Sequence, residues 1–338
     1  MCRSFINFIN MAIAVVQFTH PGGQHTLSRA EQKSLIKEWT LGAHARKFLI
    51  AKGQYVIGNV LADPQDLLFW GEWEATSQVV KIYNPADRVV NPTYLHSPFL
   101  KIDSKGNVVK GPTPQSIVVN DCGGCKVEPG CSPSCSPYQN TDPFVFGDCF
   151  YYSLCKQPSF ISLRNLDAGS VILFGSTISG MRGGPYFALD TVFVVAEKRS
   201  YAYKSFASDL KGFVPKHYDE IMGAKGNNST NSLVCYKGAT FSNPVNGMYS
   251  FVPCQPAGDA IKSGFQRVCL REKDFATIPL PTAKKNKTNP HYISNNLNSS
   301  PNITLSDLNH NKLVWEKVCQ MVSQQGQKQG MLFDYQIV

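Results

Sequence analysis

Residues 186–198 read YFALDTVFVVAEK, the longest apolar stretch in the chain. Residues 170–176, SVILFGS, form a second apolar run that ends in Gly-Ser, and the Gly-rich segment TISGMRGGP lies between the two. Short apolar runs bounded by glycine and proline are typical of buried strands joined by turns. The two runs therefore predict a pair of buried strands connected by a Gly-rich turn.

Apolar runs elsewhere in the chain predict further strands. They lie at residues 11–18 (MAIAVVQF), 54–61, 67–74, 78–83 and 116–120. Predicted strands outnumber helices, and no alternation of strand and helix is visible of the kind that builds a doubly wound sheet. We therefore expect an α+β protein with a central mixed or antiparallel sheet, which could be barrel-like.

Two helices are predicted. The first runs from Ser28 to near Gly42, because Ser28 and the glutamate three residues later fit a capping box and Trp39 continues an apolar face. The second lies near 306–323, where Ser306 is placed to cap an apolar helical pattern.

The length of 338 residues allows one large domain or two ordinary ones. Met11 could be the natural start, which would make the preceding residues an extension. The expected divisions are an N-terminal extension (1–10), a main sheet domain (11–200) with a Cys-rich loop (121–136), and a less regular C-terminal region (201–338) with a polar loop near 284–304.

The amino-acid composition indicates which kinds of binding partner and which cellular compartment to expect. The formal charge of +9 is a mild positive field that attracts polyanions, so nucleic acid or a nucleotide is a candidate partner. No apolar stretch is long enough to span a membrane as a helix. The eleven cysteines are mostly scattered singly in apolar contexts, which favours free thiols in a reducing compartment, the cytoplasm.

Residues 121–136 read DCGGCKVEPGCSPSCS and contain Cys122, Cys125, Cys131 and Cys135. Four thiolates can bind zinc tetrahedrally, and the two glycines after Cys122 suit a tight turn that carries two of them. The spacing C-x2-C-x5-C-x3-C is not that of a standard zinc finger, and it also resembles an iron–sulfur run. Structural zinc, an iron–sulfur centre and a loop without metal all stay open.

The segment THPGGQH places His20 and His25 around a Pro-Gly-Gly turn, between a predicted strand and a predicted helix. Loops at the ends of strands often carry binding residues, so both imidazoles are candidates. The alternative is a plain turn with two exposed histidines.

The segment FWGEWE puts Trp70 and Glu72 on one face of a strand and Trp73 on the other. An aromatic ring beside a carboxylate could recognise a nucleic-acid base by stacking and by hydrogen bonding. The alternative is that Trp73 belongs to the core and that the glutamates face water.

Two aspartates are candidate acids. Asp190 interrupts the most apolar stretch of the chain, where a carboxylate is costly unless it is hydrogen-bonded or paired. Asp142 lies in the segment NTDPFVFGDCF. For Asp190 the alternative is a structural aspartate bonded to Arg164, Arg182 or a backbone amide.

Five stretches taken together, THPGGQHTLS, LLFWGEWE, NTDPFVFGDCFYYSLC, GSVILFGS and FALDTVFVV, resemble an uncharacterised prokaryotic and mobile-element family. The resemblance extends to about residue 200. It implies an association with nucleic-acid modification or phage defence, and it carries no catalytic residues over to this chain.

Two classes of function follow. The first is a binding module for nucleic acid or modified nucleotides, in which Trp70 and Glu72 read a base. The second is a hydrolase or transferase that uses a pocket formed by some of the candidate residues His20, His25, Glu72, Asp142 and Asp190. Convergence of these side chains would favour the enzyme, whereas a basic groove lined by exposed aromatics would favour the binding module. We expect His20 or His25 to lie within about 10 Å of Glu72 or Asp190.

Overall fold

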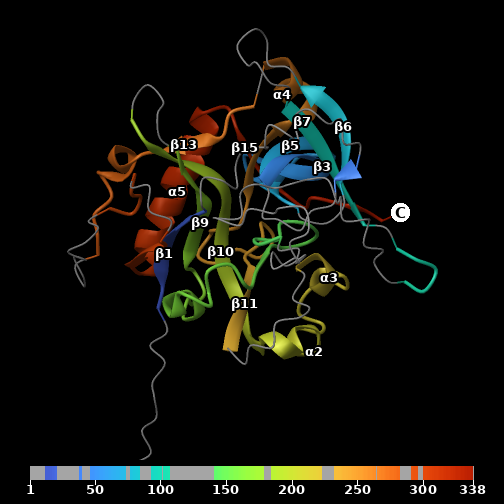
Figure 1. Ribbon diagram of the computed structural model, residues 1–338. Coiled ribbons are helices and arrows are strands. Elements are labelled where there is room, and N and C mark those ends of the chain that lie inside the picture. The colour runs from blue at the N-terminus through green and yellow to red at the C-terminus, as the bar shows by residue number, and fades with distance from the viewer. Residues whose placement is uncertain are drawn as a thin grey trace, which may run out of the picture.

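A computed structural model describes residues 12–20, 38–39, 46–73, 77–83, 93–100, 102–106, 141–178, 184–222, 232–263, 265–281, 291–295 and 300–337. Over these residues the chain is an α+β protein with mixed sheets and few helices, as the sequence predicts. Figure 1 shows long strands around β9 and β10 in one part of the molecule and a group around β3 and β5 in another. The functional argument concerns the region where these two sets of strands meet.

Among the described residues, the first sheet contains seven strands and is built around the two central apolar runs. Its strands are β1 (Ala14–Thr19), β8 (Tyr151–Tyr152), β9 (Val171–Ile178), β10 (Tyr186–Ala202), β11 (Ser232–Gly238), β13 (Val268–Leu270) and β14 (Asn302–Leu305). They follow the order β14-β1-β9-β10-β11-β8, with β13 also paired to β10. The pair β1 and β9 is parallel, so the carboxyl ends of these two strands lie side by side.

The second sheet contains nine strands in the part of the chain that the structure describes. They are β2 (Glu38–Trp39), β3 (Arg46–Ile57), β4 (Val60–Leu61), β5 (Gln65–Glu72), β6 (Ser77–Tyr83), β7 (Thr93–Leu100), β12 (Val252–Pro256), β15 (Lys328–Met331) and β16 (Gln336–Ile337). The main order is β15-β12-β5-β3-β7-β6-β2. Because β15 pairs with β3 as well as with β12, the strands β3, β5, β12 and β15 close into a small four-stranded barrel.

The α-helices are α2 (Phe206–Asp209), α3 (Tyr218–Met222), α4 (Ala257–Ser263) and α5 (Leu308–Gln324). The longest, α5, lies beside β1 and β13 in Figure 1, and its Trp315 indole donates to the carbonyl of Tyr249. The sequence predicts this helix but places its cap at Ser306, whereas Asp307 accepts the first backbone amides. None of the described helices is long and apolar enough to cross a membrane.

The secondary structure predicted from local apolar patterns is wrong at two places. The strand predicted over 54–61 is two strands, because a turn at Gly58 (φ +59°) separates β3 from β4. The helix predicted to run to Gly42 conflicts with β2, which places Trp39 in a strand paired with β6. The remainder of that predicted helix, the strand predicted over 116–120 and the predicted N-terminal extension lie outside the described residues.

Strands that follow residue 200 complete both sheets. The strands β11, β13 and β14 join the first sheet, and β12, β15 and β16 join the second. The C-terminal part therefore contributes strands to both sheets, and its division from residues 11–200 as a separate region stays a prediction. Its short strands pair with partners far away in the sequence, which a local apolar pattern cannot reveal.

Candidate functional site

Asp190 owes its position to an irregularity in β10. On one side of it Leu189 pairs with Gly175, and on the other Thr191 pairs with Phe174, so Asp190 is an extra residue in this strand. A β-bulge of this kind bends a strand and redirects the side chain it carries. The bulge thus explains how a carboxylate occupies the middle of the most apolar strand, where it is 1% exposed.

Gly175 lies opposite this bulge and has no room for a side chain. A Cβ atom there would lie 2.2 Å from the carbonyl oxygen of Ala188 and 2.7 Å from the ring of Phe187. The carbonyl belongs to the backbone of β10, so it cannot move without distorting the strand. The glycine therefore permits the close approach of β9 and β10 that places Asp190.

We expect Gly175→Ala to lower the free energy of unfolding by about 1–3 kcal/mol, because overpacking against backbone cannot relax freely. Urea denaturation measures the change. Gly258→Ala is the matched control, since a Cβ at Gly258 in α4 meets nothing within 4 Å. That control should be neutral or stabilising by up to about 1 kcal/mol, as alanine favours helices. Equal effects of the two substitutions would contradict this account of the bulge.

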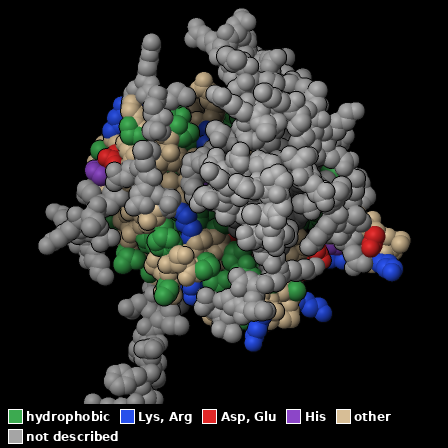
Figure 2. Space-filling model, in the orientation of Figure 1, with side chains coloured by type: hydrophobic (Ala, Val, Ile, Leu, Met, Phe, Trp, Pro, Cys, Tyr) green, Lys and Arg blue, Asp and Glu red, His purple; other side chains and the backbone are tan. Residues whose placement is uncertain are grey.

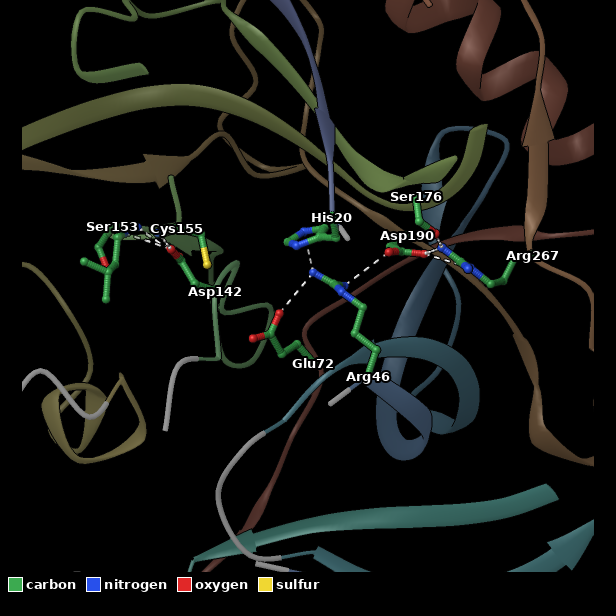
Figure 3. A network of polar contacts seen from close by, with 10 residues as sticks. His20, Arg46, Glu72, Asp142, Ser153, Cys155, Ser176, Asp190 and Arg267 are labelled. Atoms are coloured by element: carbon green, nitrogen blue, oxygen red, sulfur yellow. Dashed lines mark hydrogen bonds and ion pairs between the residues drawn. The ribbon is translucent and has the colours of Figure 1, made fainter. Parts of the chain in front are cut away.

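Arg46, the first residue of β3, binds three buried side chains (Figure 3). Its Nη2 lies 3.1 Å from Glu72 Oε2 and 2.7 Å from His20 Nε2, and its Nη1 lies 3.2 Å from Asp190 Oδ2. Arg46 and Glu72 pair directly across β3 and β5, which places both side chains on one face. The guanidinium therefore joins the second sheet to the carboxyl end of β1 and to the bulge in β10.

A second guanidinium completes the coordination of Asp190. Arg267, just before β13, donates Nε to Asp190 Oδ1 at 2.9 Å, and its Nη2 also bonds that oxygen. The same Nη2 donates to Ser176 Oγ at 2.9 Å and to the carbonyl of Ala188 at 3.0 Å (Figure 3). Burial raises the pKa of Asp190 above its ordinary value, while Arg267 and Arg46 oppose the shift.

These partners differ from those that the sequence suggests. Arg164 donates to backbone carbonyls near its own 3-10 turn and at Ser232, not to Asp190. Arg182 lies outside the described residues. Arg46 and Arg267 carried no local signal, because neither interrupts an apolar run: Arg46 stands with Lys47 at the start of β3, and Arg267 precedes β13.

His20 immediately follows β1, and contacts of both its backbone amide and its imidazole ring fix its position. Its amide donates to the carbonyl of Gly175 at 2.7 Å, and its ring contacts Phe18 and Phe174 at centroid distances of 5.0 and 6.1 Å. Arginine has only donors, so the short contact with Arg46 requires His20 Nε2 to be the acceptor. The ring proton is therefore on Nδ1, and Nε2 is the nitrogen that can take up a second proton once the Arg46 contact is released.

Asp142 lies near Arg46, and its carboxylate is surrounded by a nest of backbone amides. Its carboxylate accepts hydrogen bonds from the amides of Ser153, Leu154 and Cys155 at 3.0, 2.8 and 2.6 Å (Figure 3). Burial raises the pKa of Asp142 to about 6, against the opposing effects of these amides and of Arg46. Asp142 therefore interacts electrostatically with the same guanidinium that binds the other carboxylates.

The structure thus brings together several of the residues that the sequence singles out. His20 and Glu72 share one nitrogen of Arg46 as a partner, well within the separation of about 10 Å that we expect for a common site. Asp190 binds the other terminal nitrogen of the same side chain. Their roles in catalysis or binding stay predictions.

Trp70 and Trp73 are both packed against other side chains. Trp70 is 8% exposed, with its ring against Phe48 at 4.7 Å and Arg267 over its face at 5.4 Å. Trp73 is fully buried, which agrees with the expectation of a core residue. Glu72, however, is 4% exposed, so the expectation that it faces water is wrong. Ion pairing with Arg46 makes that burial tolerable.

Metal ligation stays a prediction for this chain. The remaining predicted residues, His25, Cys122, Cys125, Cys131 and Cys135, lie outside the described residues. Within the described part, no three His, Cys, Asp or Glu side chains are arranged to hold a metal ion. Among the cysteines described there, Cys149, Cys235, Cys254, Cys269 and Cys319 are free thiols.

Comparisons of the chain with protein-family models, with curated proteins and with solved structures give no match. The resemblance to the mobile-element family stays a prediction as well. The functional argument therefore rests on the geometry of the His20, Arg46, Glu72, Asp190 and Arg267 side chains, which we name the Arg46 cluster.

Proposed function

We propose that this chain is an enzyme of the hydrolase or transferase class and that the Arg46 cluster is its reaction centre. One observation carries the proposal: His20, Glu72 and Asp190 converge on a single buried guanidinium. The cluster lies at the carboxyl ends of the adjacent parallel strands β1 and β9. That position is where ligands commonly bind to sheets with parallel strands.

The arrangement suits proton transfer by His20. Arg46 holds Nε2, the basic nitrogen of this tautomer, so His20 takes up a proton there when a substrate hydroxyl replaces the Arg46 contact, and it returns the proton from the same nitrogen. Glu72 and Asp190 act as positioning residues, because they hold Arg46 in place. Arg46 Nε is buried without a hydrogen-bond acceptor among the described residues, and a substrate oxygen could supply one.

A nucleotide or nucleic acid is the substrate class that we propose, on the basis of the net charge of +9 and the family resemblance. A pure binding module is less well supported by the described surface. Its exposed large apolar side chains are aliphatic: Ile57, Val60, Ile161, Leu305, Leu308, Leu313 and Ile337. On the face shown in Figure 2, the described Lys and Arg side chains lie scattered, with no continuous basic groove.

We expect His20→Gln to lower turnover by about a hundredfold or more, because proton transfer is lost. Glutamine still offers an acceptor oxygen to Arg46, so the fold should be retained. The assay incubates the protein with nucleoside triphosphates, nucleoside diphosphates and single- and double-stranded oligonucleotides, and it identifies products by mass spectrometry. Circular dichroism and urea denaturation control for folding.

Two outcomes would overturn the proposal. One is a folded His20→Gln variant with undiminished turnover. The other is a wild-type chain that converts none of these substrates but retains oligonucleotides at physiological salt, with binding that weakens steeply as salt rises. The second outcome would establish the binding module instead.

A further inference from the structure

Arg271 lies on the same face of the first sheet as the Arg46 cluster. The antiparallel register between β10 and β13, continued by one residue, sets Arg271 opposite Tyr186, and the backbone of Arg271 is still extended. Residues four apart along a strand share a face, as do residues directly opposite each other. Arg267, four residues before Arg271, bonds Asp190 of the cluster (Figure 3). The two arginines therefore project from β13 to the same side.

The guanidinium of Arg271 has no acidic partner among the described residues, although two acids follow it in the sequence. The carboxylate of Asp274 accepts the backbone amide of Arg271 at 2.7 Å. The carboxylate of Glu272 accepts the amide of Asn295 at 3.0 Å and lies 3.8 Å from His291 Nε2. Both acids therefore bind other groups, and the charge of the Arg271 side chain stays without an ion pair.

The ring of Tyr186 supports this guanidinium. The Arg271 Cζ lies 5.6 Å from the centroid of the Tyr186 ring, and Tyr186 itself is only 9% exposed. An arginine over an aromatic ring keeps its N–H donors in a fixed planar fork that matches the oxygens of a phosphate. Arg271 is partly exposed, yet its Nε is buried and has no acceptor among the described residues. A phosphate oxygen would supply that acceptor.

Arg271 differs in this respect from the arginines of the cluster. Arg46 and Arg267 pair with buried carboxylates, so their charges are already compensated within the protein. Arg271 lies four residues beyond Arg267, which corresponds to roughly 13 Å of extended chain. A stacked single strand carries one phosphate about every 3.4 Å along its axis. A strand of several nucleotides can therefore reach both positions, whereas a mononucleotide or a dinucleotide cannot.

We propose that Arg271 binds a backbone phosphate of a single-stranded nucleic acid whose reacting nucleotide lies at the Arg46 cluster. The proposal rests on the proposed function and narrows its substrate class from nucleotides to single strands of several nucleotides. Arg46, Glu72 and Asp190 are each at most 4% exposed. A group in an intact duplex does not reach so enclosed a centre, so the reacting nucleotide has to be unpaired.

Fluorescence anisotropy at pH 7 with labelled oligothymidylates of two and eight nucleotides tests this site. Arg271→Gln should weaken the affinity for the longer strand about 10- to 100-fold, the effect of losing a hydrogen bond to a charged group. It should leave the affinity for the shorter strand unchanged, because that strand does not extend to Arg271. For the longer strand alone, the slope of log affinity against log salt should become shallower by about 0.7.

Arg199→Gln is the matched control. Its guanidinium also lies over an aromatic ring, that of Phe213 at 4.6 Å, but near the opposite end of β10. This substitution should leave both affinities unchanged. Arg271→Lys keeps the charge and loses the planar fork, so it should keep the salt slope while it loses part of the affinity. Urea denaturation shows whether each variant is folded, and the lysine variant serves if the glutamine variant is not.

Three results would overturn the site. One is an equal loss of affinity for both strand lengths in Arg271→Gln. Another is an equal loss in the Arg199 and Arg271 variants, which would show only a general effect of charge. The third is a wild-type chain that binds neither strand or that binds both with the same affinity.

Failure of this site and failure of the proposed function give different results. If His20→Gln abolishes turnover while Arg271→Gln keeps its affinity for the longer strand, the phosphate site is wrong and the enzyme stands. If Arg271→Gln loses that affinity while His20→Gln turns over normally, the phosphate site stands and the reaction centre is wrong.

Discussion

Replacement of Arg46 by methionine is expected to lower the free energy of unfolding by about 3–5 kcal/mol. Arg46 lies 3.1 Å from Glu72 and 3.2 Å from Asp190, and its own side chain is 1% exposed. Methionine fills a similar volume but leaves the buried Glu72 and Asp190 carboxylates without the cation that they share. Urea denaturation at pH 7 measures the loss. Arg199→Met, at an exposed position of β10, should change stability by less than about 1 kcal/mol.

A double-mutant cycle that combines Arg46→Met with Glu72→Gln tests the ion pair itself. In the wild-type chain, Glu72→Gln should destabilise, because it removes a charge that Arg46 compensates. In the Arg46→Met background the same substitution should stabilise, because glutamine removes a charge left without its cation. The reversal of sign is specific to a buried ion pair. A cost for Glu72→Gln that is the same in both backgrounds would contradict the pairing.

The central strands could be predicted because their signal is local. The strands β5, β6, β9 and β10 each coincide with an apolar run bounded by turn residues. Asp190 could be singled out for the same reason, since a carboxylate in such a run needs a partner. Its partner could not be identified, because Arg46 and Arg267 come from distant segments that only the sheet order brings together.

Arg271 and Glu72 show what a sequence pattern misses. Strand alternation correctly places Glu72 beside Trp70, but it does not show that both faces of this strand are covered, so burial of the glutamate could not be foreseen. Arg271 follows the short strand β13, and its place opposite Tyr186 depends on the pairing of β13 with β10. Both residues owe their surroundings to contacts between distant segments.

The second large effect is expected at Asp142 and depends on pH. The folded protein raises the pKa of this carboxyl from 3.8 to about 6. Between these two values the folded state holds more protons than the unfolded chain, so raising the pH favours unfolding. The contribution of Asp142 is therefore fully present below pH 3.8 and is lost as the pH rises through about 6. The loss amounts to about 3 kcal/mol, because each pKa unit corresponds to about 1.4 kcal/mol.

Asp142→Asn removes this titration. The stability of the variant relative to the wild-type chain should shift by about 2 kcal/mol in favour of asparagine between pH 4 and pH 7, as measured by urea denaturation at both values. Asp66→Asn, at an exposed position of β5, should show no comparable shift. The same difference between Asp142→Asn and wild type at both pH values would refute the assignment.

The sign of this effect bears on function. Both oxygens of this carboxylate accept backbone amides, a role that the NH2 group of an asparagine cannot fill, and yet the carboxylate lowers stability when it ionises. If the charge of Asp142 also serves the reaction through Arg46, which it influences electrostatically, Asp142→Asn should lower turnover at pH 7, although its stability relative to the wild-type chain is higher at pH 7 than at pH 4. A structural carboxylate would leave turnover unchanged, so the two measurements together distinguish the roles.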